Sequence, residues 1–229
     1  MKVVAVLLAR GGSKGIPRKN LIDFCGKPLL AWTLEQALAV KTIDSVWVSS
    51  DSREILDFAR SYGANPIRRP EDLSGDTATS ESGWLHAVDV IERQVGGIDL
   101  VVAPQVTSPV KEPSDLDRGV ELFATGHYDS MFSCSLADDL YFWRRSSDGN
   151  LESVNYDWRN RKRRQDHAAQ YIENGAFYLF SPQVLRHFNN RFGERIGMVK
   201  MEFWKSFEID SPESLRLCAA LMREFLLKD

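Results

Sequence analysis

Cysteine and histidine are scarce in this chain of 229 residues, which holds three cysteines and four histidines. Cys25, Cys134 and Cys218 are odd in number, lie far apart and show no Cys-x-x-Cys spacing. The sequence therefore indicates neither a disulfide framework nor a zinc site. The histidines are scattered and share no ligand spacing.

Long apolar runs and a strong charge of one sign are also missing. No apolar stretch reaches the roughly 18 residues that a membrane helix needs, and the first residues show no signal-peptide pattern. The formal net charge of -3 gives no general attraction to nucleic acid. We therefore expect a cytoplasmic protein without nucleic-acid or membrane partners. Its length suits one core.

The most informative segment is glycine-rich and cationic and directly follows an apolar run. Val3 to Ala9 predicts a buried first strand, and residues 10–19 then contain three glycines, one serine, one proline and four cationic residues. Glycines let the backbone approach a ligand closely, and exposed N–H groups with Lys and Arg make a seat for phosphate. We therefore expect a polyanion here. The alternative is a tight strand-to-helix turn with solvated charges.

Two better-known phosphate loops are excluded by the spacing of these residues. A Walker loop needs Gly, four residues and then Gly-Lys-Ser/Thr, but Ile16 stands where the second glycine should be after Gly11, and Lys14 is followed by Gly15. Gly11, Gly12 and Gly15 do not supply the Gly-x-Gly-x-x-Gly fingerprint of dinucleotide-binding folds. The sequence therefore supports neither a P-loop kinase nor an NAD enzyme.

Short β-branched runs alternate with segments of helical period along the chain. The expected strands are Val3–Ala9, Ser45–Ser49, Leu100–Ala103, Asp129–Ser135 and Gly175–Phe180. The expected helices are Leu29–Val40, Arg53–Tyr62, Ser80–Gln94, Asp115–Thr125 and a last one to about Leu227. Such alternation predicts an α/β sandwich with a mostly parallel sheet, whose ligands bind at the carboxyl ends of strands.

The helix ends carry their own signals. Ser52, Ser114 and Ser211 are the expected N-caps of the second, fourth and last helices. Gly63 and Gly126 are the expected stops.

Leu7 to Leu21 resembles the N-terminal signature of the acylneuraminate cytidylyltransferases, the CMP-sialic acid synthetase family. The match to Leu-x-Ala-Arg-Gly-Gly-Ser-Lys-Gly-Ile-Pro-x-Lys-Asn-Leu is nearly complete, whereas the related CMP-Kdo synthetases carry a different loop. The resemblance implies a Rossmann-like nucleotide-diphospho-sugar transferase fold. It also implies a reaction in which CTP and Mg²⁺ activate a nonulosonic acid, a nine-carbon α-keto acid sugar, giving the CMP-sugar and pyrophosphate.

The glycine-rich loop supplies the first set of candidate site residues. Its expected nucleotide contacts are Arg10, Gly11, Gly12, Ser13, Lys14, Lys19 and Asn20. Cations and hydroxyls here suit the phosphates of a nucleotidyl transfer. The resemblance implies that Arg10 and Lys19 bind CTP, so they are predicted catalytic residues. It also places Asn20 near the nucleotide.

Two further blocks resemble motifs of the same family. The segment from Arg69 to Ser80 resembles Arg-Pro-x-x-Leu-x-x-Asp-Thr, which implies contacts of Arg69 and Ser80 with base and ribose. Asp76 within it is equally suited to turn chemistry. Gln105-Val106-Thr107-Ser108-Pro109 resembles Gln-Pro-Thr-Ser-Pro, with valine for the first proline.

The side chains of this third block are expected to face substrates. The Gln105 amide can donate and accept, which suits a cytosine edge or a sugar hydroxyl. Thr107 and Ser108 are candidates for the sugar side. Lys111 stands where the family often has arginine, and it keeps a cation near the expected sugar pocket.

Glu208-Ile209-Asp210 is the fourth block. Alternation along an extended segment places both carboxylates on one face, and hard oxygen donors beside a triphosphate suit Mg²⁺. The family has Asp-x-Asp here, so the resemblance implies a metal site at Glu208 and Asp210, with Asp210 also a predicted catalytic residue. Alternatively, Asp210 serves as a turn residue before Ser211-Pro212.

Residues 136–171 are rich in polar, charged and aromatic residues and interrupt the alternation. We read one domain with a nucleotide-binding part (1–135), an inserted arm (136–171) and a return to the sheet (172–229). The resemblance implies that the arm forms a homodimer. The basic run at 159–164 is a solvated loop, a polyanion patch or a seat for the acidic sugar through Arg164 and Gln165. Asn174, in a segment like the family's Asn-Gly-Ala, is expected on the sugar side.

The sequence reveals no dedicated general base, so metal-assisted ionisation of the sugar hydroxyl is our hypothesis for the attack. Two rival functions stay open at this point. One is a non-catalytic nucleotide-binding or regulatory protein on the same scaffold. The other is a nucleotidyltransferase that acts on a sugar phosphate.

Overall fold

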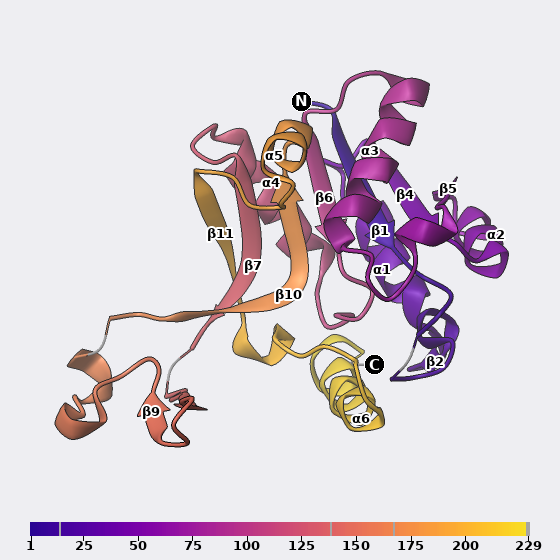
Figure 1. Ribbon diagram of the computed structural model, residues 1–229. Helices are drawn as coiled ribbons and strands as arrows, with labels where there is room; N and C mark the ends of the chain where they lie inside the picture. The colour runs from indigo at the N-terminus through magenta and orange to yellow at the C-terminus, as the bar shows by residue number, and fades with distance from the viewer. Residues whose placement is uncertain (14, 138, 167, 228–229) are drawn as a thin grey trace.

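A seven-stranded sheet with helices on both faces organises the molecule (Figure 1). The computed structural model describes residues 1–13, 15–137, 139–166 and 168–227. The strand order is β11-β7-β10-β6-β1-β4-β5. The expected α/β fold with a mostly parallel sheet is confirmed.

The N-terminal half of the sheet is parallel throughout. Its strands are β1 (Val3–Leu8), β4 (Ser45–Ser50), β5 (Asn65–Arg68) and β6 (Leu100–Pro104). β1 pairs in parallel with β4 on one side and with β6 on the other, and β4 pairs with β5. The carboxyl ends of β1, β4 and β6 therefore meet at one edge of the sheet.

The C-terminal half of the sheet contains an antiparallel strand. β10 (Tyr171–Phe180) runs antiparallel to both β6 and β7 (Ser130–Leu136). The edge strand β11 (Ile196–Met201) pairs in parallel with β7. The register between β7 and β10 shifts between Glu173 and Tyr178. This irregular stretch includes Gly175, which packs against Glu208 of the candidate site described below.

Helices cover both faces because the central strands are apolar on both sides, as buried parallel strands are. The helices are α1 (Leu29–Leu38), α2 (Arg53–Ser61), α3 (Ser80–Val95), α4 (Pro113–Ala124), α5 (Pro182–Phe188) and α6 (Pro212–Leu221). Leu7 and Val48 pack in one core cluster with Leu30 of α1, and Val6 packs in another with Trp84 of α3. Alternation along β1 thus supplies both cores.

Shorter elements complete the chain. The hairpin of β2 (Asp23–Phe24) and β3 (Lys27–Pro28) follows the 3-10 turn η1 (Lys19–Leu21). The other 3-10 turns of the main body are η2 (Glu71–Leu73) and η5 (Phe203–Lys205), and a π-helical turn, η6 (Met222–Leu226), extends α6. None of the helices in the described part of the chain combines the length and apolarity that crossing a lipid bilayer requires.

Most helix signals are confirmed, and one is wrong. Ser52 and Ser211 cap α2 and α6 through their side chains. The cap of α4 is Glu112 rather than Ser114. Pro113 takes the first helical position, where its missing N–H costs nothing, and the Asp115 side chain accepts the Glu112 backbone N–H at 2.9 Å.

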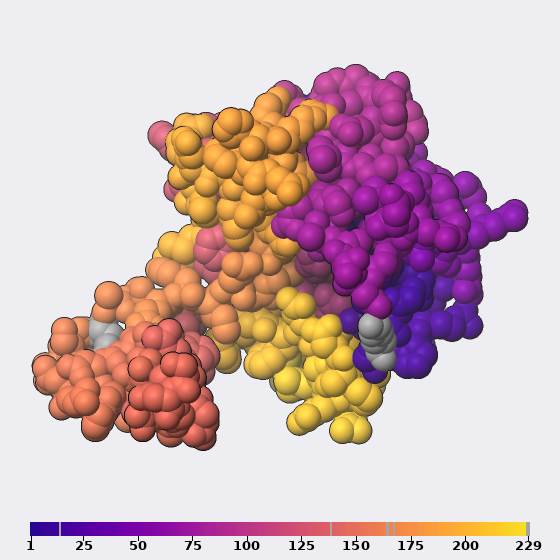
Figure 2. All heavy atoms as spheres, in the orientation of Figure 1, coloured from indigo at the N-terminus to yellow at the C-terminus, as the bar shows by residue number. Residues whose placement is uncertain are grey.

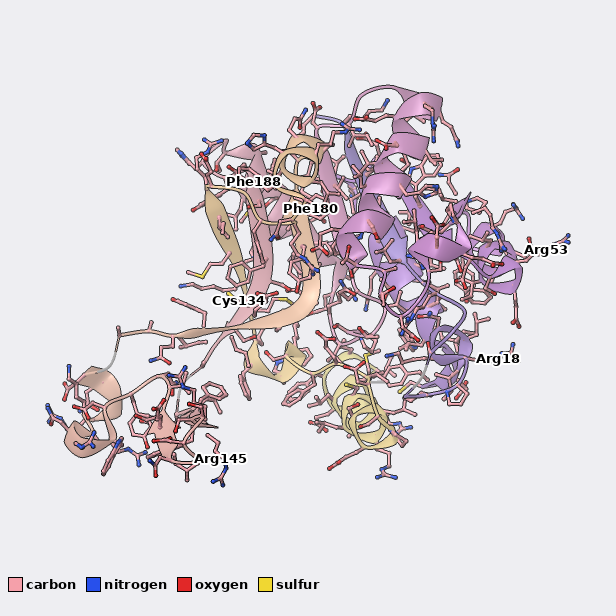
Figure 3. All side chains as sticks on the ribbon, in the orientation of Figure 1. Arg18, Arg53, Cys134, Arg145, Phe180 and Phe188 are labelled. Carbon is pink, nitrogen blue, oxygen red and sulfur yellow. The ribbon has the colours of Figure 1, made fainter. Side chains whose placement is uncertain are left out.

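The segment expected as an inserted arm lies between β7 and β10 and projects from the sheet (Figures 1 and 2). It carries β8 (Trp143–Arg145), β9 (Leu151–Ser153) and the 3-10 turns η3 (Trp158–Asn160) and η4 (Arg164–Asp166). Figure 3 shows Arg145 on this projection, whereas Arg18 and Arg53 belong to the main body. The large apolar side chains Phe142, Trp143, Leu151 and Trp158 of this projecting arm are exposed.

A buried ion-pair cluster ties α4 to the turn after β11. The Lys205 ammonium lies 2.8 Å from Glu112 Oε2, 2.9 Å from Asp115 Oδ2 and 2.9 Å from Glu202 Oε2. Burial alone lowers the pKa of a lysine, but the hydrogen bonds to these carboxylates outweigh it and raise the pKa of Lys205. The cluster fixes the chain just before it enters the fourth sequence block.

Candidate active site

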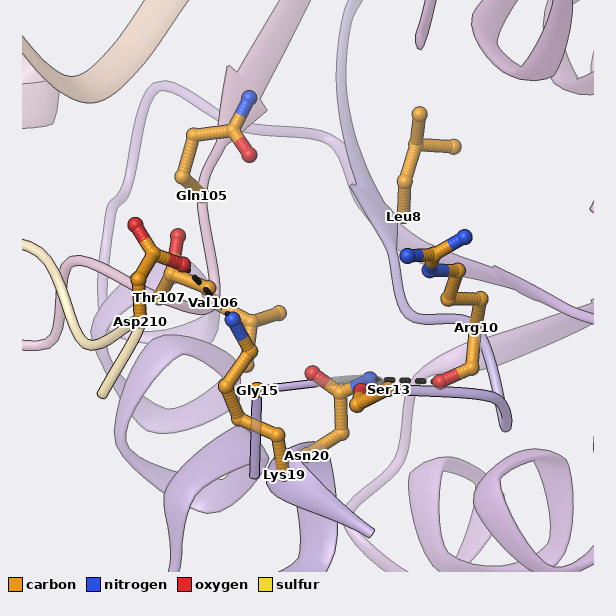
Figure 4. A pocket seen from close by; sticks show the side chains of 10 residues that line it. All are labelled: Leu8, Arg10, Ser13, Gly15, Lys19, Asn20, Gln105, Val106, Thr107 and Asp210. Carbon is orange, nitrogen blue, oxygen red and sulfur yellow. Dashed lines mark hydrogen bonds and ion pairs between the residues drawn. The ribbon is translucent and has the colours of Figure 1, made fainter. Parts of the chain in front are cut away.

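Two adjoining cavities open at the carboxyl ends of β1 and β6. The first, of about 270 Å³, is lined by Leu8, Arg10, Ser13, Gly15, Lys19, Asn20, Gln105, Val106, Thr107 and Asp210 (Figure 4). The second, of about 280 Å³, is lined by Leu8, Arg10, Arg69, Leu73, Ser74, Gly75, Asp76, Ala78, Thr79, Ser80 and Gln105. Leu8, Arg10 and Gln105 belong to both, so the two cavities form one continuous site.

The glycine-rich loop is held in shape by hydrogen bonds to its own backbone. The Gly11 N–H donates to Asp51 Oδ1 at 2.8 Å, which ties the loop to the end of β4. The buried Asn20 amide donates to the Arg10 carbonyl at 2.9 Å across the loop (Figure 4). Asn20 therefore supports the loop while it also lines the first cavity.

Lys19 joins this loop to the fourth sequence block. Its ammonium donates to the Ile209 carbonyl at 3.0 Å and to Asp210 Oδ1 at 2.8 Å (Figure 4). The backbone is equally close, because a Cβ on Gly15 would lie 2.4 Å from the Asp210 carbonyl oxygen. Glycine at position 15 is thus what allows the loop to touch the 208–210 segment.

Two guanidinium groups line the second cavity. Arg10 Nη1 lies 3.2 Å from Asp76 Oδ1 across its mouth. Arg69 is buried, and its Nε donates to Ser74 Oγ at 3.0 Å. Burial lowers the pKa of Arg69, partly opposed by Asp51, but an arginine keeps its charge at neutral pH. Cations in a poorly hydrated wall attract an anionic ligand strongly.

The turn after β6 contributes residues 105–107 to the site and Ser108 to the interior. Gln105 and Thr107 line the cavities, and the Thr107 carbonyl accepts the Ile209 N–H at 2.7 Å. Ser108 differs from the expectation. It is buried, and its hydroxyl donates to the Gly175 carbonyl at 3.2 Å, so it holds the turn on β10 rather than facing a substrate.

The two carboxylates of the fourth block occupy different places. Asp210 is exposed and lines the first cavity, whereas Glu208 is half-buried behind Thr107, whose hydroxyl lies 3.4 Å from Glu208 Oε2. Glu208 also fills the space of a missing side chain, since a Cβ on Gly175 would lie 1.6 Å from its Oε1. Burial and, after it, the charge of Asp210 raise the pKa of Glu208.

The donor set fits a hard cation only together with a ligand. Among the described residues, no group of three or more histidine, cysteine, aspartate or glutamate side chains could hold a metal ion. Mg²⁺ usually binds through one or two carboxylates plus substrate phosphates and water. Asp210, which lines the first cavity, is therefore a fitting half-site beside a triphosphate, whereas Glu208 stands behind Thr107 and lines neither cavity.

Asn174 also differs from the expectation. It is only 3% exposed, and its Oδ1 accepts the Ser133 hydroxyl at 2.6 Å and the Ala176 N–H at 3.2 Å. Its amide thereby stabilises the irregular part of β10, because buried polar groups need partners. It does not line either cavity.

The structure brings most of the predicted residues together. Those that line the site are Arg10, Ser13, Lys19, Asn20, Arg69, Ser80, Gln105, Thr107 and Asp210. Gly11 and Gly12 shape the loop without lining either large cavity, and Lys14 lies outside the described residues. Arg164 and Gln165 lie in η4 of the projecting arm, away from the cavities of the same chain (Figure 1).

Sequence reasoning missed Asp51, which anchors the loop. A signal was available, since Asp51 directly follows β4 at the same sheet edge as the loop. The rule that ligands meet strand carboxyl ends applied to β4 as well as to β1 and β6.

Comparisons with known proteins identify the family of the chain. Residues 4–227 match the family model described as Cytidylyltransferase. The chain is 35% identical over 186 residues to N-acylneuraminate cytidylyltransferase A of Danio rerio, covering 80% of this chain and 42% of that protein. It is 36% identical over 183 residues to pseudaminic acid cytidylyltransferase of Campylobacter jejuni, covering 78% of each. The chain thus spans about two fifths of the length of the fish relative.

Solved structures resemble the fold at low sequence identity. CMP:2-keto-3-deoxy-manno-octonic acid synthetase complexed with CTP superimposes with a TM-score of 0.73 at 19% identity, covering 99% of this chain and 100% of that one. The 4-diphosphocytidyl-2C-methyl-D-erythritol synthase of Anaerococcus prevotii gives 0.68 at 15% identity, covering 97% and 96%. At these identities the likeness concerns the fold alone.

The contact between the loop and Asp210 predicts a position-specific effect of alanine. Gly15→Ala should lower the free energy of unfolding by about 1–3 kcal/mol, because its Cβ meets backbone. Gly12→Ala in the same loop should be nearly neutral, since its Cβ would meet nothing within 4 Å. Urea unfolding of both variants measures the difference. Equal losses would contradict the close approach at position 15.

Proposed function

The chain belongs to the cytidylyltransferase family, and from this premise we propose that it is a Mg²⁺-dependent enzyme that activates a nonulosonic acid with CTP. The products are the CMP-sugar and pyrophosphate. One observation carries the proposal: a cation-lined cavity with Asp210 on its wall continues into a second cavity with Arg69 and Ser80. A charged triphosphate and a polar nucleoside need such a divided site.

The acceptor is proposed as a class. The relatives with about 35% identity are named for N-acylneuraminate and for pseudaminic acid, and both are nonulosonic acids. Substituents that distinguish such sugars are read by few residues, so the shared α-keto acid is what we assign. The cytoplasm, where CTP is made, is the proposed location.

The nucleotide lies across both cavities in this proposal. The triphosphate occupies the first, where Lys19, Arg10 and the Ser13 hydroxyl supply positive charge and hydrogen bonds to its oxygens. Ribose and cytosine occupy the second, with Arg69 and Ser80 as their partners. Gln105 lies between the two, within reach of the junction where the sugar must approach.

The reaction joins a sugar hydroxyl to the α-phosphorus. The anomeric hydroxyl loses its proton to solvent and its oxygen forms a bond to phosphorus. The bond from phosphorus to the bridging oxygen of the β-phosphate breaks, and pyrophosphate leaves with that electron pair. Lys19 and Arg10 are placed to stabilise the charge that grows on the phosphate oxygens. Mg²⁺ bound by Asp210, with Glu208 beside it, would neutralise further phosphate charge.

A homodimer is the proposed assembly. The arm between β7 and β10 exposes several large apolar side chains on a thin projection that has little core of its own (Figure 2). Exposed apolar patches of this kind mark protein interfaces. In a dimer, the arm of one subunit would lie against the other subunit, and Arg164 and Gln165 would serve the partner's acidic sugar.

The proposed activity predicts a specific substrate pattern. Pyrophosphate release should require Mg²⁺, CTP rather than ATP, GTP or UTP, and one acid from a panel of nonulosonic acids, with Kdo as the comparison. A coupled pyrophosphate assay measures it. CTP binding without turnover on any acid would favour a non-catalytic, regulatory nucleotide-binding protein. Turnover on a sugar phosphate would favour a nucleotidyltransferase that acts on sugar phosphates.

Asp210 is predicted to be essential for turnover. Asp210→Asn should lower kcat by about 10²–10³-fold, because the amide loses the charge that holds a cation against the phosphates. Asp57→Asn on the surface of α2 is the matched control and should keep wild-type kinetics. Steady-state kinetics with varied Mg²⁺ separates the two variants. Wild-type turnover by Asp210→Asn would remove the metal assignment.

The proposed dimer predicts that a charge on the arm dissociates it. Leu151 is 60% exposed on β9, so Leu151→Asp should turn the wild-type dimer into monomers without unfolding the main body. Leu217→Asp, at a residue 42% exposed on α6, should leave the dimer intact. Light scattering after size-exclusion chromatography gives the mass. A wild-type monomer would contradict the proposed assembly.

A further inference from the structure

Lys111 is a buried lysine that does not face the cavities. It is 1% exposed, and its ammonium donates to the Ser108 carbonyl at 2.6 Å, the Gln105 carbonyl at 3.0 Å and Thr33 Oγ1 at 3.3 Å. The sequence placed it as a cation for the sugar pocket. Instead, its three hydrogen bonds are made inside the protein, two to carbonyls of the turn that carries Gln105 and one to Thr33 of α1.

Burying the charged ammonium of Lys111 is energetically unfavourable, so its hydrogen bonds must compensate for the lost hydration. Burial lowers the pKa of Lys111 to about 7, although Asp115 and Glu208 act in the opposite direction. The hydrogen-bond acceptors of its ammonium among the described residues are two carbonyls and a hydroxyl, and none is a carboxylate. Burying an ammonium is unfavourable unless it is hydrogen-bonded, and here its hydrogen bonds tie the turn to itself and to α1.

Gln36 fastens the other end of the same turn. It is buried on α1, and its Nε2 donates to the Pro109 carbonyl at 2.9 Å and to the Lys111 carbonyl at 2.6 Å. Its Oε1 is buried without a hydrogen-bond partner in the described part of the chain. The orientation that lets Nε2 donate two hydrogen bonds to the turn therefore leaves Oε1 without a partner, which is unfavourable for a buried oxygen.

The fastened turn shapes the wall of the site. Residues 105–107 line the first cavity, and the Thr107 carbonyl holds the Ile209 N–H at 2.7 Å. Any relaxation of the turn therefore moves the Gln105 amide and the backbone that carries Asp210. Side chains in such a site must keep their places to within a fraction of an ångström to be effective.

We propose that Lys111 and Gln36 are positioning residues, which hold the turn 105–111 from the core so that Gln105 and the 208–210 segment face the bound nucleotide. The inference rests on the proposed function, which assigns CTP to these cavities. Neither residue lies at the reacting atoms. Both act through the turn, from the α1 side of the sheet.

A double-mutant cycle tests this role without needing turnover. CTP with Mg²⁺ is titrated into wild type, Lys111→Met, Gln105→Ala and the double variant by calorimetry. Lys111→Met should weaken binding about tenfold, or about 1.4 kcal/mol. If Lys111 acts through Gln105, the double variant should bind no more weakly than Lys111→Met alone, because coupled losses do not add.

Leu185→Ala is the control for loss of stability away from the site. Leu185 is 1% exposed on α5, packs in the core cluster that holds Trp84, and lines neither cavity. Both variants should lower the melting temperature, and only Lys111→Met should weaken CTP binding. If Lys111→Met does not fold, Gln36→Met removes the other fastening and should show the same coupling to Gln105.

The outcomes distinguish a failure of the positioning role from a failure of the proposed function. Wild-type affinity for CTP in folded Lys111→Met or Gln36→Met, equal weakening in Leu185→Ala, or fully additive losses would each overturn the positioning role alone. A wild-type protein that binds no CTP would overturn the proposed function and this inference with it.

Discussion

The ammonium of Lys19 bonds to the Ile209 carbonyl and the Asp210 carboxylate, and so it joins segments 190 and 191 positions apart. An ion pair with an exposed partner contributes little stability, about 0–1 kcal/mol. Its value is geometric, because it holds the glycine-rich loop against the fourth block. The absence of a side chain at Gly15 lets the two backbones touch, and Gly15, Lys19 and Asp210 together form one wall of the first cavity.

The topology explains why residues from four parts of the sequence meet here. β1, β4 and β6 are parallel neighbours, so the loop at Arg10, the anchor Asp51 and the turn at Gln105 all leave the same edge of the sheet. The 208–210 segment then closes that edge from the side, fixed to Thr107. From the opposite direction, α1 supports the turn through Thr33 and Gln36. The site is thus held from both the sheet and the helix layer.

Local chemistry made much of this predictable from the sequence. The glycines and cations after β1, and the polar residues after β6, mark strand ends by composition, and the structure places Lys19 and Gln105 on one site. The direction of a side chain depends on packing across the fold, which no motif encodes. Ser108, Lys111 and Asn174 sit in site-like motifs but turn inward, where buried carbonyls and hydroxyls need partners. The edge strand β11 was missed because an alternating six-residue segment with a glycine is a weak signal.

The most direct test of the account is a crystal structure of the protein with CTP and Mg²⁺. We expect the triphosphate against Lys19 and Ser13, the nucleoside beside Arg69 and Ser80, and a metal ion between Asp210 and the phosphates. A nucleotide bound with its base in the first cavity, or outside both cavities, would contradict it.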